Sequence, residues 1–96
     1  MRVEISPAAK EVFVAAQAEY REINPRLARR FAAQMRRVWR QLSRFPRSGP
    51  PVGELRRIVL NGFPYSVLYE IDGDLIRATI IRHQKQEPDY WADANE

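Results

Sequence analysis

The residues of this chain best suited to chemistry are its one histidine, His83, and two arginines, Arg57 and Arg82, which stand in or at the ends of β-like segments. Cleaving RNA beside a 2′-hydroxyl needs a base, an acid and cations around the phosphate as its charge builds. Arg57 and Arg82 are of the type that supplies the cations, and His83 of the type that acts as a base. Glu54, close before Arg57, is a carboxylate that would repel phosphate, and the catalytic residues stay unknown.

A structural role for His83 is the preferred interpretation. Strict alternation along residues 75–83 places His83 on one face of a strand, together with Leu75, Arg77, Thr79 and Ile81. The opposite face then carries Ile76, Ala78, Ile80 and Arg82. We expect the imidazole to bond a backbone carbonyl or Tyr69 and so to hold the segment that follows.

Arg56 and Arg57 are adjacent, so they face opposite sides of their strand. At least one of them is expected to be exposed, where it contacts a partner. The alternative is an ion pair with Glu54 or Glu70, which contributes little when it is exposed. The sequence leaves both possibilities open.

Aromatic residues gather in the middle of the last segments and near the C-terminus. A stripe of this kind along one strand face is normally core, and its members are Tyr65, Val67, Tyr69 and Ile71. Tyr90 and Trp91 follow Pro88 in an acidic stretch. We expect them to pack back onto the sheet from a short C-terminal helix, or else to bind a partner.

Two cap-and-proline signals predict two helices. Ser6-Pro7 begins the first, which ends near Glu22, and Asn24-Pro25 begins the second, which ends before Pro46. Each helix has one apolar stripe, made of Ala9, Val12, Phe13, Ala16, Tyr20 and Ile23 in the first and of Leu27, Ala28, Phe31, Met35, Val38, Leu42 and Phe45 in the second. The connection between the two helices is so short that only an αα-hairpin fits. Because each helix has an apolar stripe, the hairpin must cover an apolar surface, and the sheet is the one available.

The second predicted helix also carries seven arginines: Arg26, Arg29, Arg30, Arg36, Arg37, Arg40 and Arg44. They are most simply a solvated face, and alternatively a docking surface for acidic residues of a partner or for DNA. We interpret them as spread around the helix rather than confined to one stripe. That distribution weakens a role in nucleic-acid binding on its own.

A short strand at residues 1–5 precedes the helices, and a turn-rich connector at 47–53 follows them. Three β-like runs come after the connector, at residues 55–60, 65–71 and 75–83. Asp72-Gly73-Asp74 predicts a tight hairpin and Asn61-Gly62 a longer reversal. The prediction is one α+β domain over residues 1–96, in the order β-α-α-β-β-β. Its last three strands form an antiparallel meander, and a short C-terminal helix follows.

The composition excludes several classes of function. There is no cysteine and one histidine, so a zinc or iron–sulfur centre is not expected, and no cofactor is predicted. No secretory signal or membrane-spanning run is visible, and a cytoplasmic location is the default expectation. The net charge of +4 favours an acidic partner, whether nucleic acid or protein.

Over nearly its whole length the sequence resembles the toxins of the RelE/ParE superfamily, the toxic halves of bacterial type II toxin–antitoxin modules. The resemblance rests on motifs in a fixed order: Ser-Pro-Ala-Ala at 6–9, Pro25-Leu27-Ala28-Phe31, Leu42-Phe45-Pro46-Gly49, Leu55-Arg56-Arg57, Phe63-Pro64-Tyr65 with Val67-Tyr69, and a tail of His83-Gln84-Lys85 with Pro88-Tyr90-Trp91. The tail is similar to the ending of ParE-like members. Lys85-Gln86 stands where arginines are frequent in them.

The resemblance implies a toxin that an antitoxin holds inactive. ParE-like members inhibit DNA gyrase by binding, which is the leading expectation, whereas RelE-like members cleave messenger RNA on the ribosome. Such nucleases tend to carry lysines where this chain has Gly53 and Glu54, which favours the ParE-like alternative. An inactive toxin-like partner protein is the third possibility. Residues predicted to bind a target or partner are Arg56, Arg57, Arg82, His83, Lys85, Tyr90 and Trp91.

Overall fold

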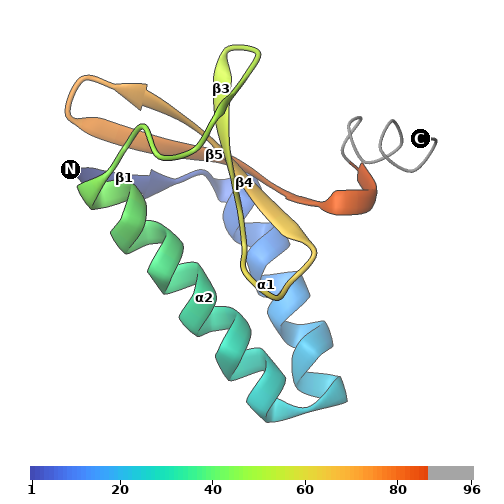
Figure 1. The fold of residues 1–96 in the computed structure, drawn as a ribbon. Coiled ribbons are helices and arrows are strands. Elements are labelled where there is room, and N and C mark those ends of the chain that lie inside the picture. Colours follow the sequence, from blue (N-terminus) through green and yellow to red (C-terminus); the bar gives the residue numbers. More distant parts are fainter. Residues whose placement is uncertain (87–96) are drawn as a thin grey trace.

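A computed structural model of the chain describes residues 1–86, and in it one sheet is covered on one face by two helices (Figure 1). The elements follow the predicted order, with one further short strand. They are β1 (Arg2–Ile5), α1 (Pro7–Ile23), α2 (Pro25–Arg44), β2 (Pro51–Val52), β3 (Leu55–Val59), β4 (Tyr65–Asp72), β5 (Leu75–His83) and the 3₁₀ turn η1 (Gln84–Gln86). The predicted α+β fold is confirmed. The predicted C-terminal helix around Tyr90 lies outside the described residues.

The five strands form a single sheet in the order β1-β5-β4-β3-β2. The last four strands pair antiparallel in sequence order, while β1 lies parallel to β5 at one edge. The tight turn after β4 uses Gly73 at a φ of 58°, which a side chain would strain. The strand β2 was predicted as part of a loop. It has only two residues, which pair with Leu55 and Arg56.

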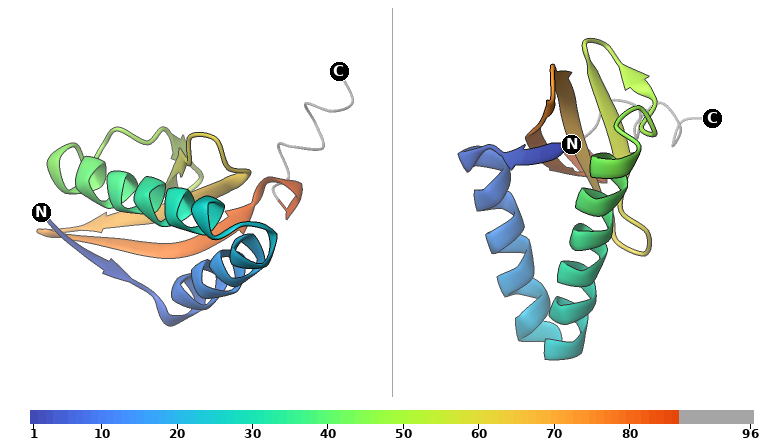
Figure 2. Two further views of the ribbon diagram at one scale, coloured as in Figure 1. Left: turned by 90° about the horizontal axis from the view of Figure 1, so that it is seen from below. Right: turned by 90° about the vertical axis from the view of Figure 1, so that its left-hand side faces the viewer.

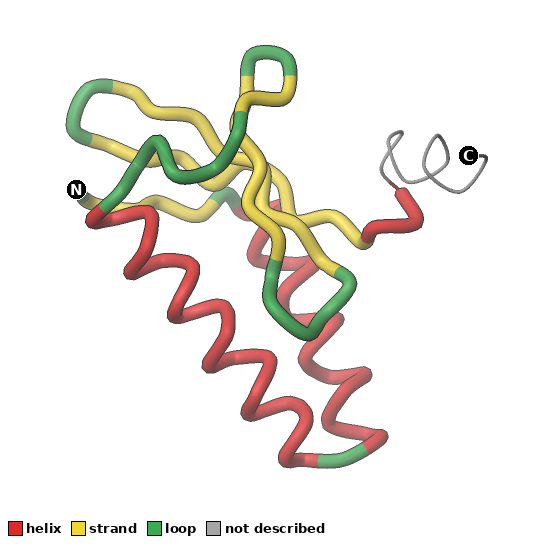
Figure 3. The backbone as a smooth tube through the Cα atoms, in the orientation of Figure 1, coloured by secondary structure: helices red, strands yellow, loops and turns green. Residues whose placement is uncertain are grey.

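Both helices begin at the predicted caps. The Ser6 hydroxyl accepts a hydrogen bond from the Ala9 N–H at 3.0 Å, and the Asn24 side chain accepts one from the Arg26 N–H at 2.9 Å. A short loop joins the two helices into a hairpin (Figure 3). The prediction was wrong for Phe45, which lies just past the end of α2 and is 63% exposed instead of belonging to the apolar stripe.

Figure 2 shows the helical hairpin and the sheet from two further sides, and the hydrophobic core is built from residues of both. Its centre is Phe31, which is fully buried and has its ring within 5.6 Å of four other rings, those of Phe13, Tyr20, Phe63 and Tyr65. Tyr65, Val67 and Tyr69 belong to this core as predicted. Two predicted stripe residues of α1 do not: Val12 is exposed and Ile23, the last residue of the helix, is 73% exposed.

A β-bulge in β5 changes the predicted distribution of side chains between the two faces. Leu68 pairs with Ile80 and Tyr69 with Ala78, so Thr79 is the extra residue. Strict alternation is therefore wrong across Thr79. Ile76, Ala78, Ile81 and His83 share the face toward the helices, and Arg77, Ile80 and Arg82 share the opposite face. Ser6 bridges the bulge, because its hydroxyl donates to the Thr79 carbonyl at 2.7 Å.

Candidate functional site

The face of the sheet away from the helices holds two of the predicted cations, and we call it the open face. Arg57 pairs across the strands with Leu68, and Arg82 pairs with Ser66. Because Ser66 and Leu68 lie two residues apart on β4, both arginines project on this side, one from each neighbouring strand. The strand spacing puts them about 10 Å apart across the sheet. The structure thus brings Arg57 and Arg82 to one surface.

The middle of the open face is apolar. Val59 pairs with Ser66 and is 50% exposed, and Ile80 pairs with Leu68 and is half-buried. Leu68 itself is buried. Apolar residues with arginine beside them are typical of the centre and rim of a protein–protein interface.

Ser66 is buried in this surface at 1% exposure, and its hydroxyl has no hydrogen-bond partner. No other buried side-chain polar atom in residues 1–86 is left unpaired in this way. An unsatisfied buried hydroxyl costs folding free energy.

His83 lies on the opposite side of the sheet from both arginines. It pairs with Tyr65, and the two rings meet edge to face with centroids 5.1 Å apart. Its Nδ1 accepts a hydrogen bond from the Lys85 N–H at 3.1 Å, which starts the 3₁₀ turn after β5. The aromatic partner is Tyr65 instead of the predicted Tyr69. These contacts give the imidazole a positioning role at the end of β5.

The fold raises the pKa of two phenols, Tyr65 and Tyr20. Burial, and to a lesser degree the Glu19 carboxylate, raises the pKa of Tyr65 above its ordinary value of 10.0. Burial likewise raises the pKa of Tyr20, with Tyr65 and Glu19 as further causes. Both side chains are therefore neutral at physiological pH. Neither supplies a base for chemistry.

Arg56 faces the helices and is bonded within the chain. One of its guanidinium nitrogens donates to the Gly49 carbonyl at 2.8 Å and to the Arg47 carbonyl at 3.2 Å. These acceptors replace the predicted Glu54 or Glu70, and Glu70 instead lies 3.9 Å from Arg77. Arg56 thereby anchors the connector that leads from α2 to β2.

Tyr69 holds the same connector from within the core. Its hydroxyl donates to the Pro46 carbonyl at 2.7 Å and accepts from the Gly49 N–H at 3.0 Å. Gly49 is required at this point because an added Cβ would lie 2.6 Å from the Arg57 carbonyl oxygen and 2.8 Å from the Tyr69 hydroxyl. The strand edge that carries Arg57 is positioned by this contact, since the Arg57 N–H donates to the Pro50 carbonyl at 3.0 Å.

The seven arginines of α2 form a single stripe, contrary to the sequence interpretation. At about 100° per residue they fall within an arc of about 120°, opposite the buried stripe that faces the sheet. All seven side chains are exposed. We call this stripe the basic face of α2, and its members are Arg26, Arg29, Arg30, Arg36, Arg37, Arg40 and Arg44.

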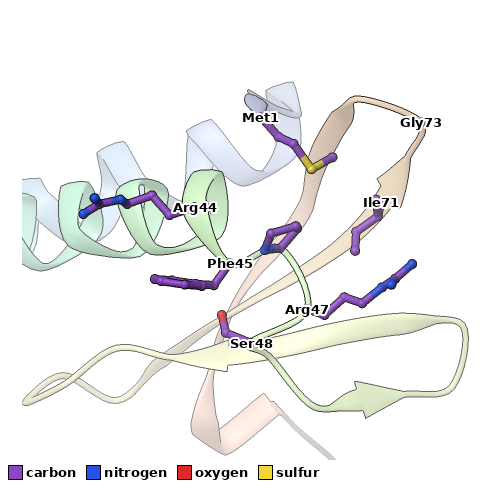
Figure 4. Close-up of a pocket in the computed structure, with 8 residues that line it drawn as sticks. Met1, Arg44, Phe45, Arg47, Ser48, Ile71 and Gly73 are labelled. Carbon is purple, nitrogen blue, oxygen red and sulfur yellow. The ribbon is translucent and has the colours of Figure 1, made fainter.

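A surface pocket lies beyond the C-terminal end of α2, next to the turn between β4 and β5. Its lining includes Phe45, Ile71, Arg44 and Arg47, and the two arginines point in opposite directions (Figure 4). They do not converge on one anion. None of the predicted site residues within the described part of the chain lines this pocket.

Three predicted site residues lie after β5, and the structure describes one of them. Lys85 is exposed on the 3₁₀ turn, while Tyr90 and Trp91 lie outside the described residues. Within residues 1–86 no group of three His, Cys, Asp or Glu side chains is arranged to hold a metal ion. No helix of this described part is long and apolar enough to cross a membrane.

The fold is thus one mixed sheet with a helical hairpin on one face and with arginines and apolar residues on the other. The family described as "ParE toxin of type II toxin-antitoxin system, parDE" matches residues 3–88 of this chain. The chain therefore belongs to the ParE toxin family, and the predicted RelE/ParE membership is confirmed.

A solved structure supports the same fold. It is described as "Chromosomal ParDE TA system from P. aeruginosa" and superimposes with a TM-score of 0.74 at 19% sequence identity. The alignment covers 86% of this chain and 95% of that one. None of the curated proteins matches the sequence.

Proposed function

We propose that this ParE-family toxin stops growth by binding DNA gyrase and that a cognate antitoxin neutralises it. The family membership supports a toxin of a type II module. The observation that favours binding over RNA cleavage is the placement of His83. It lies on the helix side of the sheet against Tyr65, whereas Arg57 and Arg82 lie on the open face.

This separation matters because of what phosphoester cleavage requires. A general base must come within hydrogen-bond reach of the 2′-hydroxyl while cations surround the adjacent phosphate. Side chains on opposite faces of a sheet diverge and do not meet around one phosphate. The Gly53-Glu54 pair before β3 adds a carboxylate where a cation would be needed.

The open face is the surface we assign to the target. Val59, Leu68 and Ile80 form an apolar centre beside Arg57 and Arg82. Binding energy in protein interfaces comes mainly from desolvated apolar groups and arginine near the centre, which fits a protein target better than RNA. Lys85, exposed just after β5, adds a further cation at the end of this strand.

The antitoxin is proposed on the grounds of charge as well as family. The chain carries a net charge of +4, so an acidic partner would bind with favourable electrostatics. The structural relative is titled as a ParDE system, which supports a partner protein for this chain too.

A RelE-like messenger-RNA nuclease remains a second candidate because Arg57 and Arg82 do share one face. Induction of the chain in a bacterial host, followed by labelled precursors of DNA, RNA and protein, separates the two. We expect DNA synthesis to fall first while messages stay intact. Early loss of protein synthesis with cut messages would favour the nuclease.

Two variants test whether growth inhibition depends on the open face or on His83. Arg57→Gln together with Arg82→Gln should relieve inhibition, because both open-face cations are lost. His83→Gln should remain toxic, because a Gln side chain at 83 offers an oxygen that can accept the Lys85 N–H bond. Equal amounts of folded protein, measured by circular dichroism after purification, control for misfolding. A harmless His83→Gln variant with intact fold would contradict the assignment.

A further inference from the structure

The positive charge of this protein is concentrated in one helix. α2 contains seven arginines and no acidic residue, and removing these seven charges from the net +4 leaves the rest of the chain at −3. Their basic face spans about 27 Å from Arg26 to Arg44 at 1.5 Å per residue. Within it only Ala33 interrupts the arginines. The face is therefore a cationic track along the whole helix with one gap, at Ala33.

This face is not neutralised by the rest of the described chain. The ion pairs found between residues of 1–86 are those of Arg77 with Glu70 and Asp72, and none involves α2. Arginines also stand one turn apart, as in the series Arg36, Arg40 and Arg44, where like charges repel and destabilise a helix. An external anion would remove that repulsion.

The composition of the face favours phosphate over an acidic protein. Protein interfaces place large apolar residues at their centre, and the basic face has none, in contrast to the open face of the sheet. The guanidinium fork binds phosphate oxygens in a bidentate manner. A convex helix about 10–12 Å across fits the B-DNA major groove, which is about 12 Å wide.

We propose that the basic face of α2 binds the phosphate backbone of duplex DNA without regard to sequence. The face points away from the sheet, because the buried stripe on the opposite side of α2 packs against it. DNA and a protein on the open face would thus occupy opposite sides of the molecule. The inference does not require that gyrase be the target.

The test is fluorescence anisotropy of a labelled duplex of about 20 bp, more than twice the roughly 8 bp that the face spans at 3.4 Å per base pair. Three arginines are replaced in one variant, R29Q/R37Q/R40Q. The matched control is R2Q/K10Q/R21Q, in which the three replaced residues are also exposed but lie outside α2. Both variants carry a net charge of +1, since three charges are taken from +4. Gln keeps helix propensity close to that of Arg, and circular dichroism verifies the fold.

The logarithm of the association constant should fall linearly with the logarithm of the salt concentration, with a slope of about −0.9 for each phosphate contact. If all three replaced arginines contact phosphate, R29Q/R37Q/R40Q should lower the magnitude of the salt slope by about 2.7 and weaken binding more than tenfold. R2Q/K10Q/R21Q should leave the slope near that of the unaltered chain. Equal weakening in both variants would show an effect of net charge alone and overturn the proposal.

Two competitors identify the ligand. Polyglutamate with the same number of charges should displace the duplex poorly, and efficient displacement would assign the face to acidic protein and refute the DNA assignment. An RNA duplex of the same length that binds more than tenfold tighter would also refute it. Absence of any DNA binding by the unaltered, folded chain at physiological salt would do so directly.

Discussion

The hydroxyl of Tyr69 provides the sharpest test of how the connector between α2 and β3 is held. Tyr69→Phe removes one oxygen from a fully buried ring and leaves its packing unchanged. The Pro46 carbonyl loses a 2.7 Å bond and the buried Gly49 N–H loses a 3.0 Å bond. At about 1 kcal/mol for each net hydrogen bond, unfolding should become easier by about 2 kcal/mol. That loss corresponds to a melting temperature lower by roughly 8–16 °C for a domain of this size.

Urea unfolding followed by circular dichroism measures this free energy. The matched control is Tyr65→Phe, because the Tyr65 hydroxyl makes no hydrogen bond with residues 1–86 and its loss should cost much less. Amide exchange at Gly49 adds a local measurement and should accelerate only in Tyr69→Phe. Equal stability of Tyr69→Phe and Tyr65→Phe would refute the claim that the Tyr69 hydroxyl anchors the connector.

Four further predictions follow from buried contacts. Gly49→Ala should destabilise the fold by about 3 kcal/mol, the upper end for overpacking, because its Cβ would lie 2.6 Å from a carbonyl oxygen, and thermal melting measures this. Ser6→Ala should cost about 1–2 kcal/mol in urea unfolding, since Ser6 both caps α1 and bridges to β5. Ser66→Ala should be neutral or stabilising by about 1 kcal/mol in the same assay, because the lost hydroxyl is unpaired. Raised pKa values of Tyr20 and Tyr65 contribute stability that is fully present below pH 10.0 and is lost as pH rises through the folded pKa, so alkaline unfolding should begin above pH 10.0 and shift upward in a Phe variant.

The helices and turns were predictable because their signals are local. Ser6-Pro7 and Asn24-Pro25 mark the first residues of the two helices. Each capping side chain accepts its hydrogen bond from a backbone N–H no more than three residues further along the chain. Gly73 likewise predicts its turn, because glycine tolerates the positive φ of 58° that it adopts there. These features depend on neighbours in the chain and need no knowledge of the rest of the fold.

The bulge at Thr79 could not be predicted in the same way. It arises from the pairing of β5 with β4, where one strand has a residue more than its partner, and the alternation of β5 gives no sign of it. Its consequence is large, because His83 shares a face with Ile76 and Ala78, whereas strict alternation had placed it on the face of Arg77. The strand β2 was missed for a similar reason, since two residues that include Pro51 become a strand only through β3.

Other features were present in the sequence and were read incorrectly. The arginines of α2 recur at steps of three, four and seven residues, which is sufficient to place them on one stripe of a helix. Tyr69 was predicted to lie in the core and to be a possible partner of His83, but the acceptor and donor that its hydroxyl contacts were not predicted. Its hydrogen-bond partners, Pro46 and Gly49, are 23 and 20 residues away, and only the tertiary structure brings them together.

Supercoiling of relaxed plasmid by purified gyrase, with the purified chain titrated into the reaction, tests the proposed function most directly. We predict that the unaltered chain and His83→Gln both abolish supercoiling, whereas the Arg57→Gln/Arg82→Gln double variant leaves it intact. Undiminished supercoiling in the presence of the folded, unaltered chain, together with cleaved messages in a translating extract, would contradict the account and establish the nuclease in its place.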